Sequence, residues 1–292
     1  MDTPVHKRFR WPRLFIRFAV AGLAGYAGLI LVLYFLQTAM IFPRGGSVWR
    51  TPADPAYRWA YEDVTLDVWN ESTCGWYVPV ENARGTLLFC HANAGTMADR
   101  LESMAVFRDL GFNCFIFDYG GYGNSSGSPS EDRCNADALA AWTHLTSTKG
   151  EKADRIVIFG RSLGGGIATN LAWEVRSTPP AALILESTFE SVVKMGQEIF
   201  LFVPVRWFIR DRFDSAAKIG EVNTPVLIIH SPDDEIIPYH HGKRLFELAR
   251  EPKTFLDIRG DHNAGWYDSG LVYTEGLAQF LDPLVPRAGL DQ

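Results

Sequence analysis

Gly160-Arg161-Ser162-Leu163-Gly164 is the stretch of this 292-residue chain that decides its fold. It follows an apolar run, Ile156-Val157-Ile158-Phe159, and precedes a run of small residues over 165–172. The first run predicts a buried strand, and the second predicts a helix that packs closely on a sheet. A serine on the sharp turn between them projects its hydroxyl away from the backbone, and glycine tolerates the crowding on either side. Because the pentapeptide alone also occurs by chance, the rest of the chain must supply partners for Ser162.

The length and composition predict one large folded domain with an appendage. Hydrophobic residues make up 47% of the chain and charged residues 21%, which is typical of globular proteins. The net charge is −6, but residues 1–44 hold six basic side chains and one acidic one, while the remainder holds 22 basic and 33 acidic ones. An acidic body without a basic patch argues against nucleic acid as a partner.

An uncharged stretch from Phe18 to Pro43 explains the basic N-terminal end. Its core, residues 19–36, is long enough as a helix to cross about 30 Å of hydrocarbon. The stretch lacks the short apolar region and small-residue exit of a signal peptide, so we expect an uncleaved transmembrane anchor over residues 18–40. A cleaved signal peptide and a buried core helix are the alternatives. Five basic residues precede the span and Arg44 follows it, which predicts a cytoplasmic N-terminus and a main domain on the periplasmic or extracytoplasmic side.

Beyond the anchor, apolar strand-like runs alternate with helical patterns. This alternation, after an initial antiparallel hairpin, predicts an α/β fold with a mainly parallel central sheet flanked by helices. The expected strands are 62–68, 73–78, 85–90, 113–118, 155–159, 181–186, 225–230 and 254–258, and the expected helices are 97–110, 132–148, the stretch after Ser162, 239–249 and 270–280.

One long aromatic segment, Val192 to Ile209, interrupts the alternation after a strand end. Open α/β sheets place their ligands at that edge, so we expect a short helical cap over the site, suited to an apolar or acyl group. An extra helix packed elsewhere on the core is the alternative. The expected organisation is a basic N-terminal tail over 1–17, the transmembrane anchor over 18–40, a linker over 41–60, the main domain over 61–284 with its cap at about 188–222, and a tail over 285–292.

A serine hydroxyl becomes a nucleophile when a base accepts its proton and an acid orients the base. On this kind of sheet the acid and then the histidine follow the serine along the chain, each just past a strand. Asp234 is the first choice for the acid, with Asp233 and Glu235 as alternatives in the same turn. His262 is the expected base, because it comes directly after the last strand.

The remaining histidines have structural interpretations. His91 and His230 each end a buried strand, where a hydrogen bond that holds a loop is the favoured role. His240 and His241 begin a helix and are expected at the surface or at the mouth of the site. No Cys/His spacing of a metal site is present in the sequence, so we expect neither a metal nor a cofactor.

The oxyanion of a tetrahedral intermediate needs two N–H donors. We expect the backbone N–H of Leu163, directly after the serine, and that of Asn93 in the loop after the first parallel strand to supply them.

Several segments together resemble one family. They are His91-Ala92-Asn93-Ala94-Gly95, Asp118-Tyr119-Gly120-Gly121-Tyr122-Gly123, the pentapeptide, Asp233-Asp234-Glu235 and Asp261-His262-Asn263. The set resembles the α/β-hydrolase superfamily and, more narrowly, the membrane-anchored Bem46-like and ABHD13/ABHD17-like serine hydrolases, over about residues 60–282. Ala92 replaces the glycine usual in that group, and Gly120 replaces the usual arginine. The resemblance implies cofactor-free hydrolysis of an ester, thioester or amide, and some members deacylate lipidated proteins.

The sequence therefore predicts a membrane-anchored serine hydrolase that cleaves an ester or thioester bond through Ser162, His262 and Asp234. The expected partners are an acyl-bearing small molecule, a lipid or a lipidated protein, together with the bilayer that holds the N-terminal helix. An aminopeptidase-like serine peptidase is the first alternative, with Glu186, Glu190 or Glu198 as the group that would bind a free amine. A catalytically inactive membrane scaffold is the alternative from another class.

Overall fold

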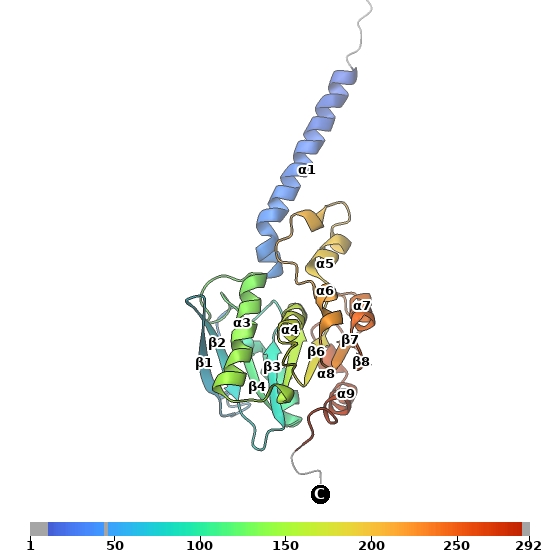
Figure 1. The fold of residues 1–292 in the computed structure, drawn as a ribbon. Helices are drawn as coiled ribbons and strands as arrows, with labels where there is room; N and C mark the ends of the chain where they lie inside the picture. The colour runs from blue at the N-terminus through green and yellow to red at the C-terminus, as the bar shows by residue number, and fades with distance from the viewer. Residues whose placement is uncertain (1–10, 44–45, 288–292) are drawn as a thin grey trace, which may run out of the picture.

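A long N-terminal helix, α1, stands on a body in which helices enclose one central sheet (Figure 1). The computed structural model describes residues 11–43 and 46–287. Residues 1–10 of the predicted basic tail, residues 44–45 of the predicted linker and residues 288–292 of the predicted C-terminal tail therefore lie outside the described residues.

The sheet has eight strands in the order β1-β2-β4-β3-β5-β6-β7-β8. β1 and β2 form an antiparallel hairpin, β2 pairs antiparallel with β4, and every pair from β4 to β8 is parallel. This arrangement confirms the predicted mainly parallel sheet that follows a hairpin. The strands are β1 Glu62–Val68, β2 Glu71–Val78, β3 Gly85–Cys90, β4 Phe112–Phe117, β5 Ile156–Arg161, β6 Ala182–Glu186, β7 Val226–His230 and β8 Lys253–Asp257.

Both faces of the sheet are covered, because successive side chains of a strand point to opposite sides. In β3, Leu88 and Cys90 face the core that contains residues of α3, α4 and α7. Leu87 and Phe89 face the second core, which contains residues of α2 and α9. The central strands are consequently apolar at nearly every position, as their sequences predict.

The helices largely follow the predicted ranges. The predicted helix over 97–110 divides into a 3-10 turn and α2, and the helix over 132–148 ends at Thr143 and continues as a π turn. The helical elements are α1 Trp11–Ile41, η1 Met97–Arg100, α2 Leu101–Asp109, α3 Glu131–Thr143, η2 His144–Thr148, η3 Ala153–Arg155, α4 Leu163–Glu174, α5 Val192–Ile199, η4 Val205–Trp207, α6 Ser215–Lys218, η5 Ile219–Glu221, α7 His240–Leu248, α8 Gly265–Asp268 and α9 Leu271–Leu281.

α1 is longer than the predicted span at both ends. Its segment Arg13–Ile41 is long and apolar enough to cross a membrane, and none of its most apolar window is buried in the fold. A core helix would be covered, so the exposure of α1 agrees with an anchor. The chain after α1 lies on the body: Phe42 is buried against Phe213, and the Arg50 guanidinium donates to the Ala98 carbonyl at 2.8 Å.

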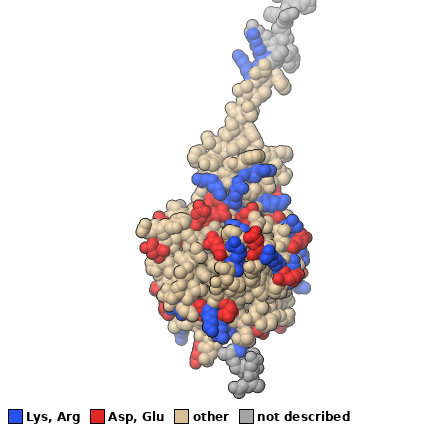
Figure 2. Space-filling model, viewed as in Figure 1, with Lys and Arg blue, Asp and Glu red and all other residues tan. Residues whose placement is uncertain are grey.

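The cap comprises α5, η4, α6 and η5, between β6 and β7. α5 lies beside the lower end of α1, above the edge of the sheet where the parallel strands end (Figure 1). The surface of the neck formed by α1 and the cap is mostly uncharged, and basic side chains gather in this view where the cap meets the body (Figure 2). Lys194, Arg206, Arg210 and Arg212 are the basic residues between Val192 and Phe213.

Candidate active site

Ser162 occupies a strained turn between β5 and α4. Its φ of 54° and ψ of −122° lie in a region that side chains rarely adopt. The Ser162 N–H donates to the Glu186 carbonyl at 2.9 Å, which ties the turn to β6. A Cβ atom on Gly164 would lie 2.0 Å from the carbonyl oxygen of Cys90, so the close approach of α4 to β3 requires glycine there. The pentapeptide thus presents the serine at the carboxyl edge of the sheet.

Two loops from later strands bring an imidazole and a carboxylate to the serine. The Ser162 Oγ lies 3.1 Å from His262 Nε2. On the other side of the ring, His262 Nδ1 lies 2.8 Å from Asp234 Oδ2 and 3.0 Å from Oδ1. The three residues are 7–8% exposed, so water has restricted access to these contacts. When a hydroxyl, an imidazole and a carboxylate contact one another in this spatial order, the imidazole can accept the serine proton and make the hydroxyl oxygen a nucleophile at neutral pH.

The turn after β7 separates its three acidic residues. Asp233 is exposed, and Glu235 accepts the backbone N–H of His262 at 3.1 Å without reaching the ring nitrogen that Asp234 meets. Asp234 Oδ1 also accepts the N–H groups of Ile236 and Ile237. Burial alone raises the pKa of the Asp234 carboxyl, but contacts with His230, His262 and the Ile237 N–H outweigh it, and the pKa lies below its usual range. Asp234 is therefore ionised at neutral pH.

His230 supports the acidic turn. Its Nε2 lies 2.9 Å from the Ile237 carbonyl oxygen and 3.4 Å from Asp234 Oδ2, and the ring is fully buried. These contacts fit the loop-holding role predicted from its position at the end of β7.

The loop after β3 lies against the same hollow as the serine. Asn93 and Leu163 both line that hollow, together with Ala92. The Tyr122 hydroxyl donates to the Asn93 carbonyl at 2.8 Å, and the Asn93 side chain donates to the Ile41 carbonyl at 3.1 Å. The loop is thus held by the body on one side and by the end of α1 on the other.

The hollow around Ser162 and His262 has a volume of about 790 Å³, within the usual range for small-molecule sites. One part of its lining is polar and includes Asp99, Arg100, Ser103 and Arg161. Another part is apolar and is formed by the end of α1 and by the cap: Met40, Ile41, Phe189, Val192, Met195 and Ile199. A cavity with both kinds of wall suits a substrate that has a polar and an apolar part.

The polar wall depends on a buried ion pair. Arg161 Nε lies 2.6 Å from Glu186 Oε1, and the Arg161 Nη1 donates to Ser103 Oγ at 2.9 Å. Burial lowers the pKa of Arg161, but Glu186 and Tyr273 outweigh burial and raise it. Burial lowers the pKa of Arg100, and the nearby Arg161 lowers it further. Two guanidinium groups therefore lie near one end of the hollow, together with the carboxylates of Asp99 and of Glu186, which bonds Arg161.

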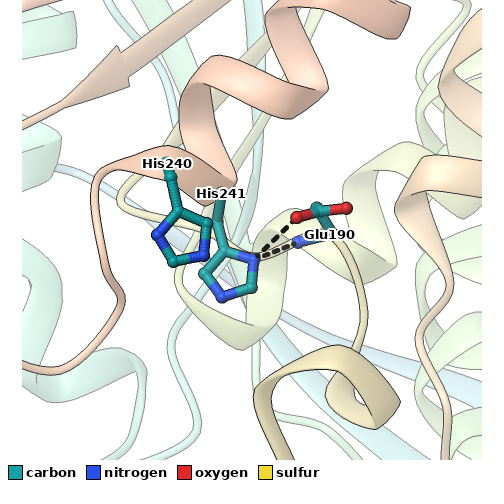
Figure 3. A group of neighbouring side chains, drawn as sticks. All are labelled: Glu190, His240 and His241. Carbon is teal, nitrogen blue, oxygen red and sulfur yellow. Dashed lines mark hydrogen bonds and ion pairs between the residues drawn. The ribbon is translucent and has the colours of Figure 1, made fainter. Parts of the chain in front are cut away.

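His241 lies neither at the surface nor along the hollow, contrary to the expectation from its position at the start of a helix. It is fully buried, because the segment that leads into the cap packs over the start of α7, where Glu190 lies beside the ring (Figure 3). Its Nδ1 lies 3.3 Å from Glu190 Oε1, and its Nε2 lies 3.3 Å from Glu198 Oε2. Burial lowers the pKa of His241 to about 4, so the ring is neutral at physiological pH. His240 remains exposed and lies 3.1 Å from Glu198.

Glu190, His240 and His241 offer ligand atoms within 4.8 Å of one another, a spacing that a metal ion could use. The contacts with the two glutamates account for the arrangement without one. Of the carboxylates that an aminopeptidase would need for a free amine, Glu186 pairs with Arg161, while Glu190 and Glu198 contact His241 and His240 respectively.

The sequence patterns did not predict that the end of α1 lines the hollow. Met40 and Ile41 line it although they belong to the predicted anchor and linker. The available signal was the length of the uncharged stretch, which continues to Pro43 and exceeds the roughly 20 residues that a bilayer requires. Arg161 was also missed; its signal was a charged side chain between a buried strand and the serine.

Comparisons with known proteins agree with this architecture. Residues 85–200 match the family model described as the alpha/beta hydrolase fold. The Arabidopsis thaliana alpha/beta hydrolase domain-containing protein WAV2 is 33% identical over 292 residues, covering 89% of this chain and 92% of that protein. The lysophosphatidylserine lipase ABHD12 of Rattus norvegicus is 32% identical over 230 residues; the match covers 68% of this chain and 56% of the lipase.

Among solved structures, the Pyrococcus furiosus esterase Pf2001 superposes with a TM-score of 0.67 at 19% identity, covering 83% of this chain and 96% of the esterase. That likeness establishes the fold only. The sequence matches establish the family: the chain belongs to the α/β hydrolases of the ABHD type and is a hydrolase.

Proposed function

We propose that this protein is a membrane-anchored serine hydrolase that cleaves the ester bond of a lipid-like acyl substrate through Ser162, His262 and Asp234. The observation that carries the proposal is the continuous set of contacts from Ser162 Oγ through both ring nitrogens of His262 to Asp234, with separations of 3.1 and 2.8 Å. Thioesters are the second substrate class.

In the first half of the reaction, Ser162 Oγ attacks the acyl carbonyl carbon while its proton passes to His262 Nε2. Asp234 holds the Nδ1–H of His262, so that Nε2 is free to accept the proton. The carbonyl oxygen becomes an oxyanion, and the N–H groups of Asn93 and Leu163 are its proposed donors. The intermediate collapses, the ester C–O bond breaks, and the leaving alcohol takes the proton from His262.

In the second half, water attacks the acyl-enzyme. His262 Nε2 accepts a proton from this water, and the hydroxide adds to the acyl carbon. Collapse releases the carboxylic acid and returns the proton to Ser162 Oγ. The cycle is balanced by one water molecule, and no step calls for a metal or an organic cofactor.

The lining of the hollow supports an amphiphilic substrate. The wall with Asp99, Arg100 and Arg161 suits a polar group, while Met195 and Ile199 at the other suit an acyl chain. The name of the ABHD12 relative, a lysophosphatidylserine lipase, makes lysophospholipids the first esters to test. The free-amine site that a peptidase requires has less support, because its candidate carboxylates are engaged.

We also propose that α1 crosses the bilayer with its N-terminus in the cytoplasm, leaving the hydrolase domain on the extracytoplasmic side. Basic residues such as Arg13 and Arg17 at the start of α1 support that orientation. Protease protection of a C-terminal tag in sealed vesicles tests it: a tag degraded only from the cytoplasmic side would reverse the orientation.

A fluorophosphonate probe tests the nucleophile in the full-length protein. We expect the wild type and Ser128→Ala, a change at an exposed serine, to be labelled, and Ser162→Ala to be unlabelled. Lysophospholipids, p-nitrophenyl esters, acyl thioesters and aminoacyl amides then rank the substrate classes. Equal labelling of wild type and Ser162→Ala would refute Ser162 as the nucleophile, and no labelling of the wild type would favour the inactive scaffold.

A further inference from the structure

An apolar groove separates α1 from the cap. It has a volume of about 170 Å³ and is lined from α1 by Leu33, Met40 and Ile41. The cap contributes Met195, Ile199 and Val205 to the facing wall. Gln37 also borders the groove, and its amide is occupied by backbone partners. The lining therefore presents hydrocarbon to any occupant.

The groove adjoins the hollow that contains Ser162. Met40, Ile41, Val192, Met195 and Ile199 line both spaces. An elongated molecule with its reacting group at Ser162 would consequently have an apolar path toward α1.

The two walls of the groove are joined by hydrogen bonds. Gln37, only 4% exposed, accepts the backbone N–H of Arg210 at 2.9 Å and donates to the Tyr34 carbonyl at 2.7 Å. The Arg210 side chain also donates to Thr38 Oγ1 at 3.0 Å. A buried amide in an otherwise apolar helix would be costly without such partners. These bonds fix the cap to the end of α1.

The far end of the cap lies beside the middle of α1. The Tyr26 hydroxyl donates to the Phe202 carbonyl at 2.7 Å. Around this contact, Leu201, Phe202 and Trp207 are 77–88% exposed. The 31 residues of α1 extend about 46 Å, and a hydrocarbon core is about 30 Å thick. If α1 spans the bilayer, the apolar end of the cap meets the membrane.

We propose that the groove between α1 and the cap binds one acyl chain of a membrane lipid and delivers its ester to Ser162. The inference rests on the proposed function and adds to it that the anchor helix forms one wall of the substrate site. The acyl chain of the lipid moves from the bilayer along α1 without passing through water, because both the groove and the exposed end of the cap are apolar.

Filling the groove tests the proposal. Leu33→Trp narrows it from α1 and Ile199→Trp narrows it from the cap. We would measure kcat/KM of the full-length protein in neutral lipid vesicles for a short-chain and a long-chain p-nitrophenyl ester. Each buried methylene favours binding by roughly a factor of four, so displacing two of them lowers the long-to-short ratio of kcat/KM at least about tenfold.

Two matched tryptophan substitutions serve as controls. Leu36→Trp changes a 50% exposed residue of α1 outside the groove lining, and Gln197→Trp changes an exposed residue of α5 that lines neither the groove nor the hollow. Both are expected to retain the wild-type ratio. An unchanged ratio in both Leu33→Trp and Ile199→Trp, in protein that still reacts with the fluorophosphonate probe, would overturn the proposal.

A binding measurement separates this proposal from the proposed function. A palmitic acid with a terminal diazirine is irradiated with full-length Ser162→Ala protein in neutral vesicles, and the crosslinked peptides are identified. We expect crosslinks within 33–41 and 192–209. Crosslinks there without ester hydrolysis by the wild type would refute the function and keep the groove, whereas crosslinks elsewhere alone would refute the groove.

Discussion

Replacing Asp234 with asparagine separates the electrostatic role of this residue from its structural one. Asp234 Oδ1 accepts the backbone N–H groups of Ile236 and Ile237 at 3.0 and 2.8 Å, and an asparagine carbonyl oxygen can keep both bonds. The asparagine NH₂ group then faces His262 Nδ1, where Asp234 Oδ2 now lies at 2.8 Å. Because NH₂ donates, Nδ1 must accept, and the ring proton moves to Nε2.

A proton on Nε2 blocks the reaction. Nε2 lies 3.1 Å from Ser162 Oγ and, once protonated, cannot accept the serine proton. In other serine hydrolases the corresponding wrong tautomer lowers kcat about 10⁴-fold, or about 5 kcal/mol of transition-state stabilisation. We expect a loss of that order in Asp234→Asn with the fold retained, because the shape of the side chain and its backbone bonds are preserved.

The assay is kcat for a soluble p-nitrophenyl ester, with circular dichroism as the check on folding. Asp233→Asn is the matched control, because Asp233 is an exposed neighbour in the same turn. We expect it to stay within about twofold of the wild type, as surface substitutions usually do. An Asp234→Asn enzyme that retains more than a tenth of wild-type kcat, or a larger loss in Asp233→Asn, would show that another carboxylate orients His262.

Three further predictions concern Gly164, His241 and the N-terminal helix. Gly164→Ala places a Cβ 2.0 Å from the Cys90 carbonyl oxygen and should lower the free energy of urea unfolding by about 3 kcal/mol or more, whereas Gly28→Ala, with no atom within 4 Å, should not. Burial holds the pKa of His241 at about 4 in the fold against an ordinary 6.5, so the unfolded chain binds more protons between these values. Stability to urea should therefore fall as the pH drops from 6.5 to 4, and less so in His241→Gln; an equal fall in both would contradict the burial argument. A chain lacking residues 1–41 should leave membranes after a carbonate wash, and its retention would mean that the anchor lies elsewhere.

Local sequence patterns predicted much of the fold because local chemistry determines it. The strand predicted over 85–90 is observed as Gly85–Cys90, since a six-residue run with Thr86 as its one polar side chain suits a buried central strand. The position of Ser162 was predictable for a similar reason: the close packing of β5, α4 and β3 demands the glycines that mark the turn. Asp234 and His262 were located through the rule that side chains at parallel strand ends converge.

Contacts between segments that are distant in the chain could not be predicted from local sequence patterns. Met40 and Ile41 meet the cap about 150 residues later in the chain, and no local pattern specifies that meeting. His241 was expected at the surface or at the mouth of the site because it begins a helix, but Glu190 and Glu198 of the opposing segment contact both of its ring nitrogens. Whether a polar side chain is buried depends on which residues pack against it, and the tertiary fold determines those residues.

The cap is held at both ends, and this constrains how substrate reaches Ser162. On one side Gln37 and Thr38 of α1 hydrogen-bond to Arg210, and on the other Glu198 of α5 contacts His240 and His241. Opening the cap as a lid would break both sets of contacts and expose the buried Gln37 amide and His241 ring to a new environment. A path along α1 breaks neither set. The anchor therefore has two connected roles in this proposal, since the helix that holds the enzyme at the bilayer also forms the wall along which the acyl chain enters.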